Sequence, residues 1–441
     1  MEVSLLQILE ARENRVLRQK ELLARFGKPL ICFTMNIAGP VKRTDLICQG
    51  FRLGCGFLEA QLKGEGIPIL FSQHEEAETG CQAFYVVDCA PARAKALCLQ
   101  IEEEQPVGRL FDMDVLAPDG SKEARAIPRK CLLCDQPAQI CGRSRAHTVE
   151  ALQHRTNELL REAVIARDAR HIARIAQQSL LYEVCTTPKP GLVDCHNSGS
   201  HRDMDLFTFM SSSAALFPYF ETCARIGLES TALPPQAVFS RLRMPGKLAE
   251  QAMEEATDGV NTHKGAIFSM GILCAAAGRL PQDLRTPEAV CAQCAAMLEG
   301  ITTRDFAGIT LENAVTNGQK LYVQYGITGI RGQAEAGFPA VLEAGLPTLE
   351  AGLARGLSLN DAGCATLLHL MVAATDTNLI KRSDLQTRNT VTERIACLLQ
   401  ETPFPRQEEL KRLDEDFIQK NLSPGGSADL LAITYFLHFL K

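Results

Sequence analysis

The spacing of apolar residues divides the chain into two parts. Before about residue 150, short apolar runs alternate with turn residues, and the runs at 29–35 and 83–88 predict strands. Residues 5–26 and 92–104 repeat apolar positions at helical spacing. The first part is therefore predicted to be an α+β domain.

The second part has a helical pattern throughout. Residues 143–187 contain no Gly and no Pro, and apolar residues recur there at helical spacing. Ala- and Leu-rich helical segments separated by Gly- and Pro-containing loops follow, and the nearly apolar stretch 266–277 predicts a buried helix. We predict two domains, an α+β domain at 1–165 and an all-α domain at 166–441.

Length and composition favour a soluble two-domain protein. A chain of 441 residues exceeds one ordinary core. A net charge of −6 and the lack of Trp argue against nucleic-acid binding. The first residues are rich in charge and have no apolar run, so we expect no secretion signal, no membrane span and a cytoplasmic location. The 17 cysteines are then expected to be reduced thiols.

The segment 108–115 places two carboxylates two residues apart. In a strand, Asp112 and Asp114 point to the same face. Such a pair can hold Mg²⁺ together with substrate phosphates, as in a nucleotidyltransferase site. Solvated surface carboxylates are the alternative.

Two other segments of the first domain carry candidate chemistry. The glycines of 50–56 are suited to let the backbone approach a phosphate, with Arg52 as a charged donor; a bent strand or turn is the alternative. Cys131, Cys134, Cys141 and His147 have ligand types and gaps compatible with zinc, although buried thiols in a compact turn are also compatible.

Taken together, three segments resemble one family. GRLFDMDV at 108–115, GFRLGCG at 50–56 and CLLCDQPAQICGRSRAH at 131–147 look like holo-citrate lyase synthase, also called apo-citrate lyase phosphoribosyl-dephospho-coenzyme A transferase. The resemblance covers about residues 1–160. It implies a nucleotidyltransferase-like fold and transfer of a phosphoribosyl-dephospho-coenzyme A group to a Ser of the acyl carrier (gamma) subunit of citrate lyase, with release of pyrophosphate. Asp112 and Asp114 would carry Mg²⁺, and Arg52 and Arg109 would face phosphates.

Residues 186–205 form the densest polar stretch of the chain. Asp194, His201, Asp203 and Asp205 are suited to share a metal and polyphosphate site, and Lys189 is a point charge for phosphate. An exposed surface loop is the alternative, since loops collect polar residues in any case.

Four more polar clusters interrupt the helical half. Segments 259–265 and 423–431 precede apolar helices, whose N-termini favour anions, although plain caps fit as well. Segments 331–339 and 375–378 add further polar groups. We expect all of them to share one polar cleft. The candidate substrate- and phosphate-binding residues are Asn261, His263, Lys264, Arg331, Asp376, Asn378, Ser423, Gly425, Gly426 and Ser427.

These motifs, from about residue 170 to the end, resemble triphosphoribosyl-dephospho-coenzyme A synthase. The resemblance implies that the 2′-hydroxyl of 3′-dephospho-coenzyme A attacks the anomeric carbon of ATP ribose, adenine leaves and the triphosphate stays. Asp203 and Asp205 are then expected to hold Mg²⁺, Asp194 or Glu183 to act as base, and Lys189, Lys264 and Arg331 to bind phosphates.

One departure from that family is visible. After Asp376-Thr377-Asn378 an Arg-Gly-Gly element is expected, but the chain reads Leu379-Ile380-Lys381-Arg382-Ser383-Asp384. The role of Arg382 is therefore open at this point.

The leading hypothesis is a bifunctional transferase that makes and then attaches the citrate lyase prosthetic group. One alternative is the same chemistry for malonate decarboxylase. Another is an all-α, Mg²⁺-dependent ADP-ribosyl hydrolase joined to a zinc-stabilised binding module.

Overall fold

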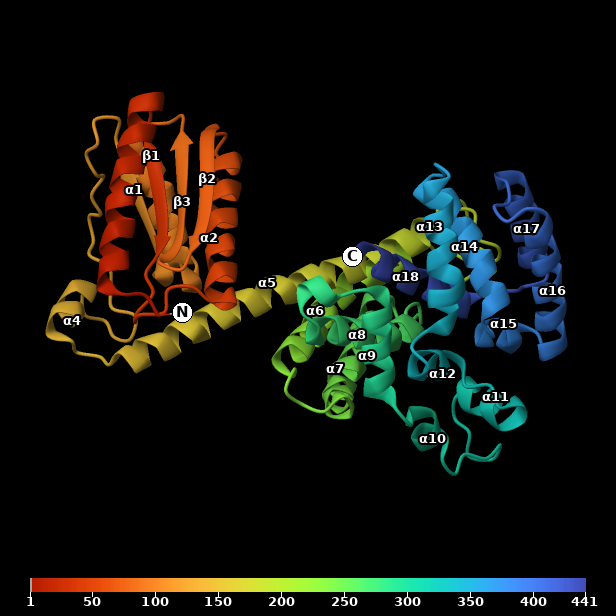
Figure 1. Cartoon of the computed structure of the whole chain (residues 1–441). Helices are drawn as coiled ribbons and strands as arrows, with labels where there is room; N and C mark the ends of the chain where they lie inside the picture. The colour runs from red at the N-terminus through yellow and green to blue at the C-terminus, as the bar shows by residue number, and fades with distance from the viewer. Residues whose placement is uncertain (1) are drawn as a thin grey trace. The chain divides into compact units, whose positions relative to one another are not determined.

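The computed structural model describes residues 2–441. The chain forms two compact units, which meet in sequence between Arg167 and Asp168 (Figure 1). Unit 1 holds a small antiparallel sheet with helices, and unit 2 is mostly helical. Helix α5 (Val149–Cys185) contributes residues to both. The predicted α+β and all-α classes are confirmed at this level.

Unit 1 is built on a four-stranded sheet of order β2-β3-β1-β4. Its strands are β1 (Leu30–Met35), β2 (Ile69–Ala77), β3 (Gly80–Val87) and β4 (Phe111–Leu116). Every neighbouring pair is antiparallel. The predicted strands at 29–35 and 83–88 are confirmed, and the segment with the two carboxylates is also a strand.

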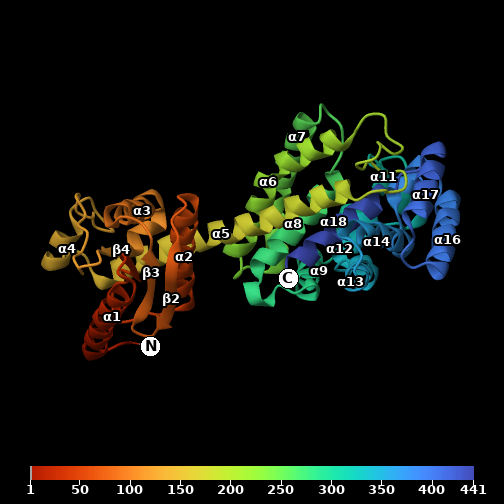
Figure 2. The ribbon, with the colours of Figure 1, turned by 90° about the horizontal axis from the view of Figure 1, so that it is seen from above.

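Helices cover both faces of this sheet. Figure 2 shows α1 (Leu5–Phe26) on one side and α3 (Pro91–Glu104) on the other. Helix α2 (Asp45–Gly64) packs with α3 on the second face. Phe111, Met113 and Val115 of β4 join the α2–α3 core, and because side chains alternate along a strand, Asp112 and Asp114 face the α1 side. The remaining helical segments of unit 1 are η1 (Pro106–Leu110) and α4 (Ala138–Ser144).

Side chains of α3 satisfy the open edge of β4. Glu102 accepts a hydrogen bond from Met113 N at 2.7 Å, and Lys95 donates to Met113 O at 2.9 Å. Both side chains are nearly buried. Unpaired backbone groups at a sheet edge invite pairing with another chain, so these two contacts close the edge beside the carboxylates.

The glycine-rich segment 50–56 lies inside α2, so the alternative of a bent strand or turn is wrong, and the predicted approach of its backbone to a phosphate is not supported by this position within a helix. The glycines permit close packing of the helix instead. A Cβ atom on Gly54 would come within 2.4 Å of the Phe33 ring, whereas one on Gly56 would meet nothing within 4 Å.

Unit 2 packs its helices around one core, with α8 (Lys264–Arg279) at its centre. Residues 269–278 of α8 are all buried, which confirms the predicted buried helix. Among residues 2–441, no helix is both long and apolar enough to cross a membrane. The other elements of unit 2 are α6 (Leu206–Glu229), α7 (Pro235–Ala256), η2 (Gln282–Leu284), α9 (Pro287–Leu298), α10 (Ile301–Phe306), α11 (Asn317–Tyr325), α12 (Gly329–Glu335), η3 (Val341–Gly345), α13 (Leu346–Ala354), α14 (Leu359–Ala373), α15 (Thr377–Arg382), α16 (Leu385–Glu401), α17 (Gln407–Gln419) and α18 (Gly425–Phe439).

The two glycines of α2 give a matched test of this packing. Gly54→Ala should destabilise unit 1 by about 1–3 kcal/mol, because the new methyl group overlaps the Phe33 ring. Gly56→Ala should be neutral or stabilise by up to about 1 kcal/mol through helix propensity. Hydrogen exchange of the β1 and α2 amides measures unit 1 separately. Equal exchange rates in the two variants would contradict the packing.

Candidate active sites

A polar cavity of about 780 Å³ lies in unit 2. Side chains from the loop after α5, the start of α8, α12, α15 and the start of α18 line it. The expected shared cleft thus exists as a cavity. Fourteen of the candidate residues line it: Glu183, Lys189, His201, Asp203, Asn261, His263, Lys264, Arg331, Asp376, Asn378, Ser423, Gly425, Gly426 and Ser427.

The loop at 186–205 is folded into unit 2, so the exposed-loop alternative is wrong. The Asp194 carboxylate accepts hydrogen bonds from the backbone N–H groups of Lys189, His196 and Asn197 at 2.7–3.0 Å. Asp414 of α17 accepts two more from this loop, from Gly191 N and Asn197 Nδ2. Asp194 does not line the cavity, and its contacts give it the role of bracing the loop.

Lys189 is buried beside Glu183 at one wall of the cavity. Its ammonium contacts the Glu183 carboxylate and donates to the Glu183 carbonyl at 2.7 Å. Burial raises the pKa of Glu183, and Lys189 opposes that shift. Since only 1% of Lys189 is exposed, it acts first as the counterion of Glu183 and not as the free phosphate ligand the sequence suggested.

Arg382, in the segment where an Arg-Gly-Gly element was expected, contacts the loop at 186–205. Its guanidinium donates to Ser200 O at 2.8 Å and to Nδ1 of His201 at 3.0 Å. The other ring nitrogen of His201 lies 2.9 Å from Ser423 Oγ, and because Nδ1 accepts from Arg382, this Nε2–H donates. Burial, and then Arg382, lowers the pKa of His201, so the ring is neutral and joins two loops of the cavity wall.

The helices α8 and α18 both begin at the cavity. Gly265, Gly425 and Gly426 line it in their first turns, where helix geometry leaves N–H groups without intrahelical acceptors. The positive end of the helix dipole adds to the attraction for anions. Two helix N-termini in one cavity therefore favour negative charge there.

Asp376 connects the start of α18 with the start of α15. Its carboxylate accepts hydrogen bonds from the N–H groups of Asn378 and Leu379 at the start of α15. It also accepts from N and Oγ of Ser427 in α18, at 2.7 and 2.9 Å. The hydrogen bonds of Asp376 therefore join the starts of α15 and α18. They also use the hydroxyl group of Ser427 and both carboxylate oxygens of Asp376.

His263 is buried at the N-terminus of α8. Its Nδ1 lies 2.6 Å from Ser212 Oγ, and its Nε2 has no hydrogen-bond partner among the described residues. Burial lowers the pKa of His263 to about 3. The ring is therefore neutral, with one polar atom available in the wall of the cavity.

Asp429 is a cavity residue that sequence reasoning missed. It lies in α18, and its Oδ2 packs so close to Gly265 that a Cβ there would come within 2.1 Å. Burial raises the pKa of Asp429 well above its ordinary value, and Glu183 and Asp376 raise it further. It lies within the polar segment 423–431, but it was not named among the candidate residues there, since it follows the helix start and stands among apolar residues.

Other charged groups complete the cavity. Lys264 pairs with Glu250 at 2.6 Å, and Arg331 pairs with Asp305 at 3.1 Å, yet both remain about half exposed. Asn261 accepts a hydrogen bond from Lys264 N. Lys381 also lines the cavity.

The predicted Mg²⁺ pair of unit 2 is not brought together. Asp203 lines the cavity and lies 3.8 Å from His201, whereas Asp205 caps α6 by accepting from Thr208 N at 2.9 Å. Asp205 does not line the cavity. Mg²⁺ usually takes one or two protein carboxylates and completes its shell with water and phosphate. Of the predicted pair, only Asp203 lies where it could serve as such a ligand.

In unit 1, Asp112 and Asp114 share one face of β4, as predicted. Lys122 pairs with Asp114 at 2.6 Å, and Arg129 lies 3.8 Å from Asp112. Burial, and next Asp114, raises the pKa of Asp112, while Arg129 opposes the shift. The pair therefore favours an added cation, which fits Mg²⁺ shared with a phosphate.

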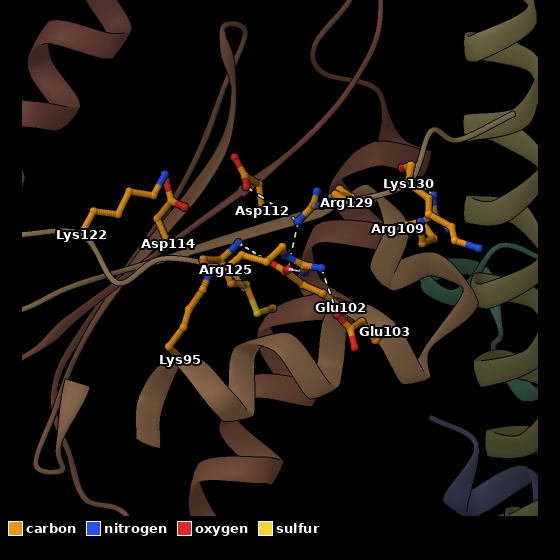
Figure 3. Close-up of polar contacts among 11 residues, drawn as sticks. Lys95, Glu102, Glu103, Arg109, Asp112, Asp114, Lys122, Arg125, Arg129 and Lys130 are labelled. Carbon is orange, nitrogen blue, oxygen red and sulfur yellow. Dashed lines mark hydrogen bonds and ion pairs between the residues drawn. The ribbon is translucent and has the colours of Figure 1, made fainter. Parts of the chain in front are cut away.

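Glu102 of α3 forms ion pairs with two arginines, one of which also lies near Asp112. Figure 3 shows Arg125 and Arg129 directed at Glu102, which Arg129 contacts at 2.9 Å. Arg125 also pairs with Glu103 at 2.9 Å. The sequence analysis did not single out these arginines; Arg129 contacts both Glu102 and Asp112, and Lys122 contacts Asp114.

The two arginines that were predicted to face phosphates make other contacts. Arg52 is exposed on α2 and forms two 2.7 Å hydrogen bonds with Glu76 of β2. Arg109 donates to the carbonyl oxygens of Lys130 and Cys131 at 2.7 and 2.6 Å. Neither side chain is directed at Asp112, because each has a nearer acceptor.

The four candidate zinc ligands do come together. The ligand atoms of Cys131, Cys134, Cys141 and His147 all lie within 4.8 Å of one another. Among residues 2–441 this is the one group of three or more such side chains with converging ligand atoms.

Comparison with known proteins agrees with this division into two sites. Residues 3–163 match the model of the family described as apo-citrate lyase phosphoribosyl-dephospho-CoA transferase, and residues 169–441 match that of ATP:dephospho-CoA triphosphoribosyl transferase. Proteins named CitXG from Haemophilus influenzae and Leuconostoc mesenteroides subsp. cremoris are each 33% identical, over 99% of this chain and 96% and 97% of their own lengths. The 2-(5''-triphosphoribosyl)-3'-dephosphocoenzyme-A synthase of Escherichia fergusonii is 40% identical over 62% of this chain and 92% of its own length.

The depressed pKa of His263 predicts acid sensitivity of unit 2. The folded ring takes up a proton only near pH 3, while the unfolded ring does so near pH 6.5, so stability is lost as pH falls through this window. The loss should reach about 2 kcal/mol at pH 5. Urea titrations from pH 7 to 5 should show a shallower loss for His263→Gln than for the wild type.

The exposed His196 supplies the control for this experiment. His196→Gln should retain the wild-type dependence of stability on pH. If His263→Gln and the wild type lose stability equally between pH 7 and 5, the burial of a neutral ring is not the cause.

Proposed function

The chain belongs to the family of fused apo-citrate lyase transferase and triphosphoribosyl-dephospho-coenzyme A synthase proteins, and from this membership we propose how its residues divide two consecutive reactions. Unit 2 makes 2′-(5-triphosphoribosyl)-3′-dephospho-coenzyme A and adenine from ATP and 3′-dephospho-coenzyme A. Unit 1 transfers the phosphoribosyl-dephospho-coenzyme A group to apo-citrate lyase.

The observation that carries the assignment for unit 2 is the convergence of fourteen separately predicted residues on one cavity with two helix N-termini. The triphosphate of ATP binds at the first turns of α8 and α18, where N–H groups and helix dipoles attract it. Lys264, Arg331, Lys381 and Arg382 supply charge around that position. Asp203 would hold Mg²⁺, which neutralises phosphate charge when bound.

Proton transfer falls to two carboxyl groups of the cavity. Glu183, kept beside Lys189, accepts the proton of the attacking 2′-hydroxyl, in preference to Asp194, whose oxygens already hold the loop. Asp429, whose pKa burial raises well above its ordinary value, donates a proton to the departing adenine. One carboxyl group as base and another as acid suit ribosyl transfer through an oxocarbenium-like state.

His263 is a second donor in the same wall. Thr262 Oγ1 donates to Ser212 Oγ at 2.8 Å, which leaves the Ser212 proton for Nδ1 of His263. The Nε2 atom then carries the ring proton and binds a substrate acceptor without carrying charge.

For unit 1 we propose a nucleotidyltransferase-like site on β4. Asp112 and Asp114 would hold Mg²⁺, which neutralises phosphate charge when bound. Arg129 and Lys122 replace Arg52 and Arg109 as the groups that meet the phosphates, because they contact Asp112 and Asp114, and Arg125 joins them through Glu102, which it shares with Arg129. A Ser hydroxyl of the acyl carrier (gamma) subunit attacks the phosphate next to the ribose, and pyrophosphate leaves.

We assign residues 1–165 to the transferase and 166–441 to the synthase, and place both reactions in the cytoplasm. The match of unit 1 to the apo-citrate lyase family favours citrate lyase over malonate decarboxylase and over a non-catalytic binding module. The match of unit 2 to a dephospho-coenzyme A transferase family favours ribosyl transfer over ADP-ribosyl hydrolysis.

Two aspartates of unit 2 give a matched test of the synthase assignment. Asp429→Asn removes the proposed proton donor, so the rate of adenine release from ATP and dephospho-coenzyme A should fall about 100-fold or more. Asp205→Asn alters only a helix cap outside the cavity and should leave that rate within about twofold. Chromatography of free adenine measures both.

The same variants separate the two reactions. When the triphosphoribosyl product is supplied, Asp429→Asn should still load the apo acyl carrier at the wild-type rate. Full adenine release by Asp429→Asn, or equal losses in both variants, would contradict the role of Asp429.

A further inference from the structure

The cysteine cluster of unit 1 has no part in the two reactions as described. We propose that Cys131, Cys134, Cys141 and His147 bind one zinc ion, and that this ion holds segment 117–148 so that Arg129 is positioned beside Asp112 and Arg125 beside Glu102. The second half of this inference rests on the proposed transferase function, whereas the first half does not.

The distances within the cluster match a tetrahedral zinc site. Cys134 Sγ lies 3.5 Å from Cys141 Sγ and 3.4 Å from Nε2 of His147. Zinc bonds of about 2.3 Å to sulfur and about 2.0 Å to nitrogen place tetrahedral ligands roughly 3.5–3.8 Å apart. Two of the six ligand separations therefore already match such a site, and all six lie within 4.8 Å.

The chemistry of the set also selects this ion. Three thiolates and one imidazole form a closed, soft ligand set of the kind that holds structural zinc. The 3.5 Å separation of the two sulfur atoms is far longer than the roughly 2.05 Å of a disulfide bond. Leu133 N donates to Cys131 Sγ at 3.5 Å, a backbone contact that orients the sulfur.

The segment needs such a link, because it buries few apolar side chains. Between β4, which ends at Leu116, and α4, which begins at Ala138, there is no helix or strand. Ile127 is 76% exposed and Leu133 is 37% exposed. Hydrophobic burial therefore contributes little here, and a metal ion is the usual substitute for a missing core.

The cluster is joined directly to the carboxylate site. Cys131 follows Arg129 and Lys130 in sequence, and Arg109 holds the carbonyl oxygens of Lys130 and Cys131. Arg129 in turn contacts Glu102 at 2.9 Å and Asp112 at 3.8 Å. Fixing Cys131 therefore fixes the backbone that carries Arg129. Arg109 acts as a positioning residue between the metal cluster and the face of β4 that carries Asp112 and Asp114.

The test compares Cys134→Ser and His147→Ala with Cys89→Ser, a unit 1 cysteine outside the cluster. The full-length protein is purified without chelators, and its metal content is measured by mass spectrometry. The wild type and Cys89→Ser should hold about one zinc per chain, and the two cluster variants should hold almost none.

Two further readouts test positioning. Without zinc, trypsin should cleave faster after Arg125, Arg129 and Lys130. The efficiency of acyl carrier loading should fall about 100-fold, because small displacements of positioned groups are costly, while adenine release by unit 2 should not change. Adding zinc back after chelation of the wild type should restore loading.

The possible outcomes are distinct. A wild type with no zinc and with freely titrating cluster thiols overturns the metal site. Zinc that can be removed without any change in carrier loading or in trypsin cleavage overturns the positioning role. If the wild type loads no carrier at all, the proposed transferase function fails, while zinc content and trypsin cleavage still decide the metal site.

Discussion

The cavity of unit 2 depends on the carboxylate of Asp376, which is buried and accepts four hydrogen bonds from the starts of α15 and α18. A buried carboxylate is tolerated only when such donors replace water. Asp194 and Asp414 brace the neighbouring loop in the same way. Because Asp376, Asp194 and Asp414 are occupied by these structural hydrogen bonds, we assign the proton transfers to Glu183 and Asp429.

Unit 1 follows the same rule on a smaller scale. Glu102 closes the edge of β4 through Met113 N and also holds Arg125 and Arg129. One buried carboxylate thus fixes both the strand that carries Asp112 and the arginines beside it. The position of the cations follows from the way the sheet edge is closed.

The sequence predicted what periodicity and local patterns determine. Helix α1, strands β1 and β3 and the buried α8 were visible in apolar spacing, whereas β2 was not predicted; the cavity followed from polar clusters at helix starts. The role of each carboxylate was not predictable, because an Asp that caps a helix and an Asp that faces a cavity look alike in sequence. Asp194 and Asp205 were assigned to chemistry for this reason, and Asp429 was missed inside an apolar helix.

The roles of the glycines at 50–56 and of Arg52 and Arg109 were not predictable for a related reason. The glycines of 50–56 allow close packing of α2 on Phe33, a long-range contact that leaves no local signature. Arg52 and Arg109 found acceptors far along the chain, in Glu76 and at Lys130. The role of such a glycine or arginine depends on the residue it contacts in the folded protein, and the sequence alone does not identify that residue.

The central claim is that one chain makes and attaches the prosthetic group at two separate sites. The most direct measurement is one incubation of the wild type with ATP, Mg²⁺, 3′-dephospho-coenzyme A and the apo acyl carrier subunit of citrate lyase, following adenine by chromatography and carrier mass by spectrometry. We expect adenine release together with a carrier mass gain equal to the phosphoribosyl-dephospho-coenzyme A group. Absence of adenine release in the presence of dephospho-coenzyme A, or adenine without any mass gain of the carrier, would contradict it.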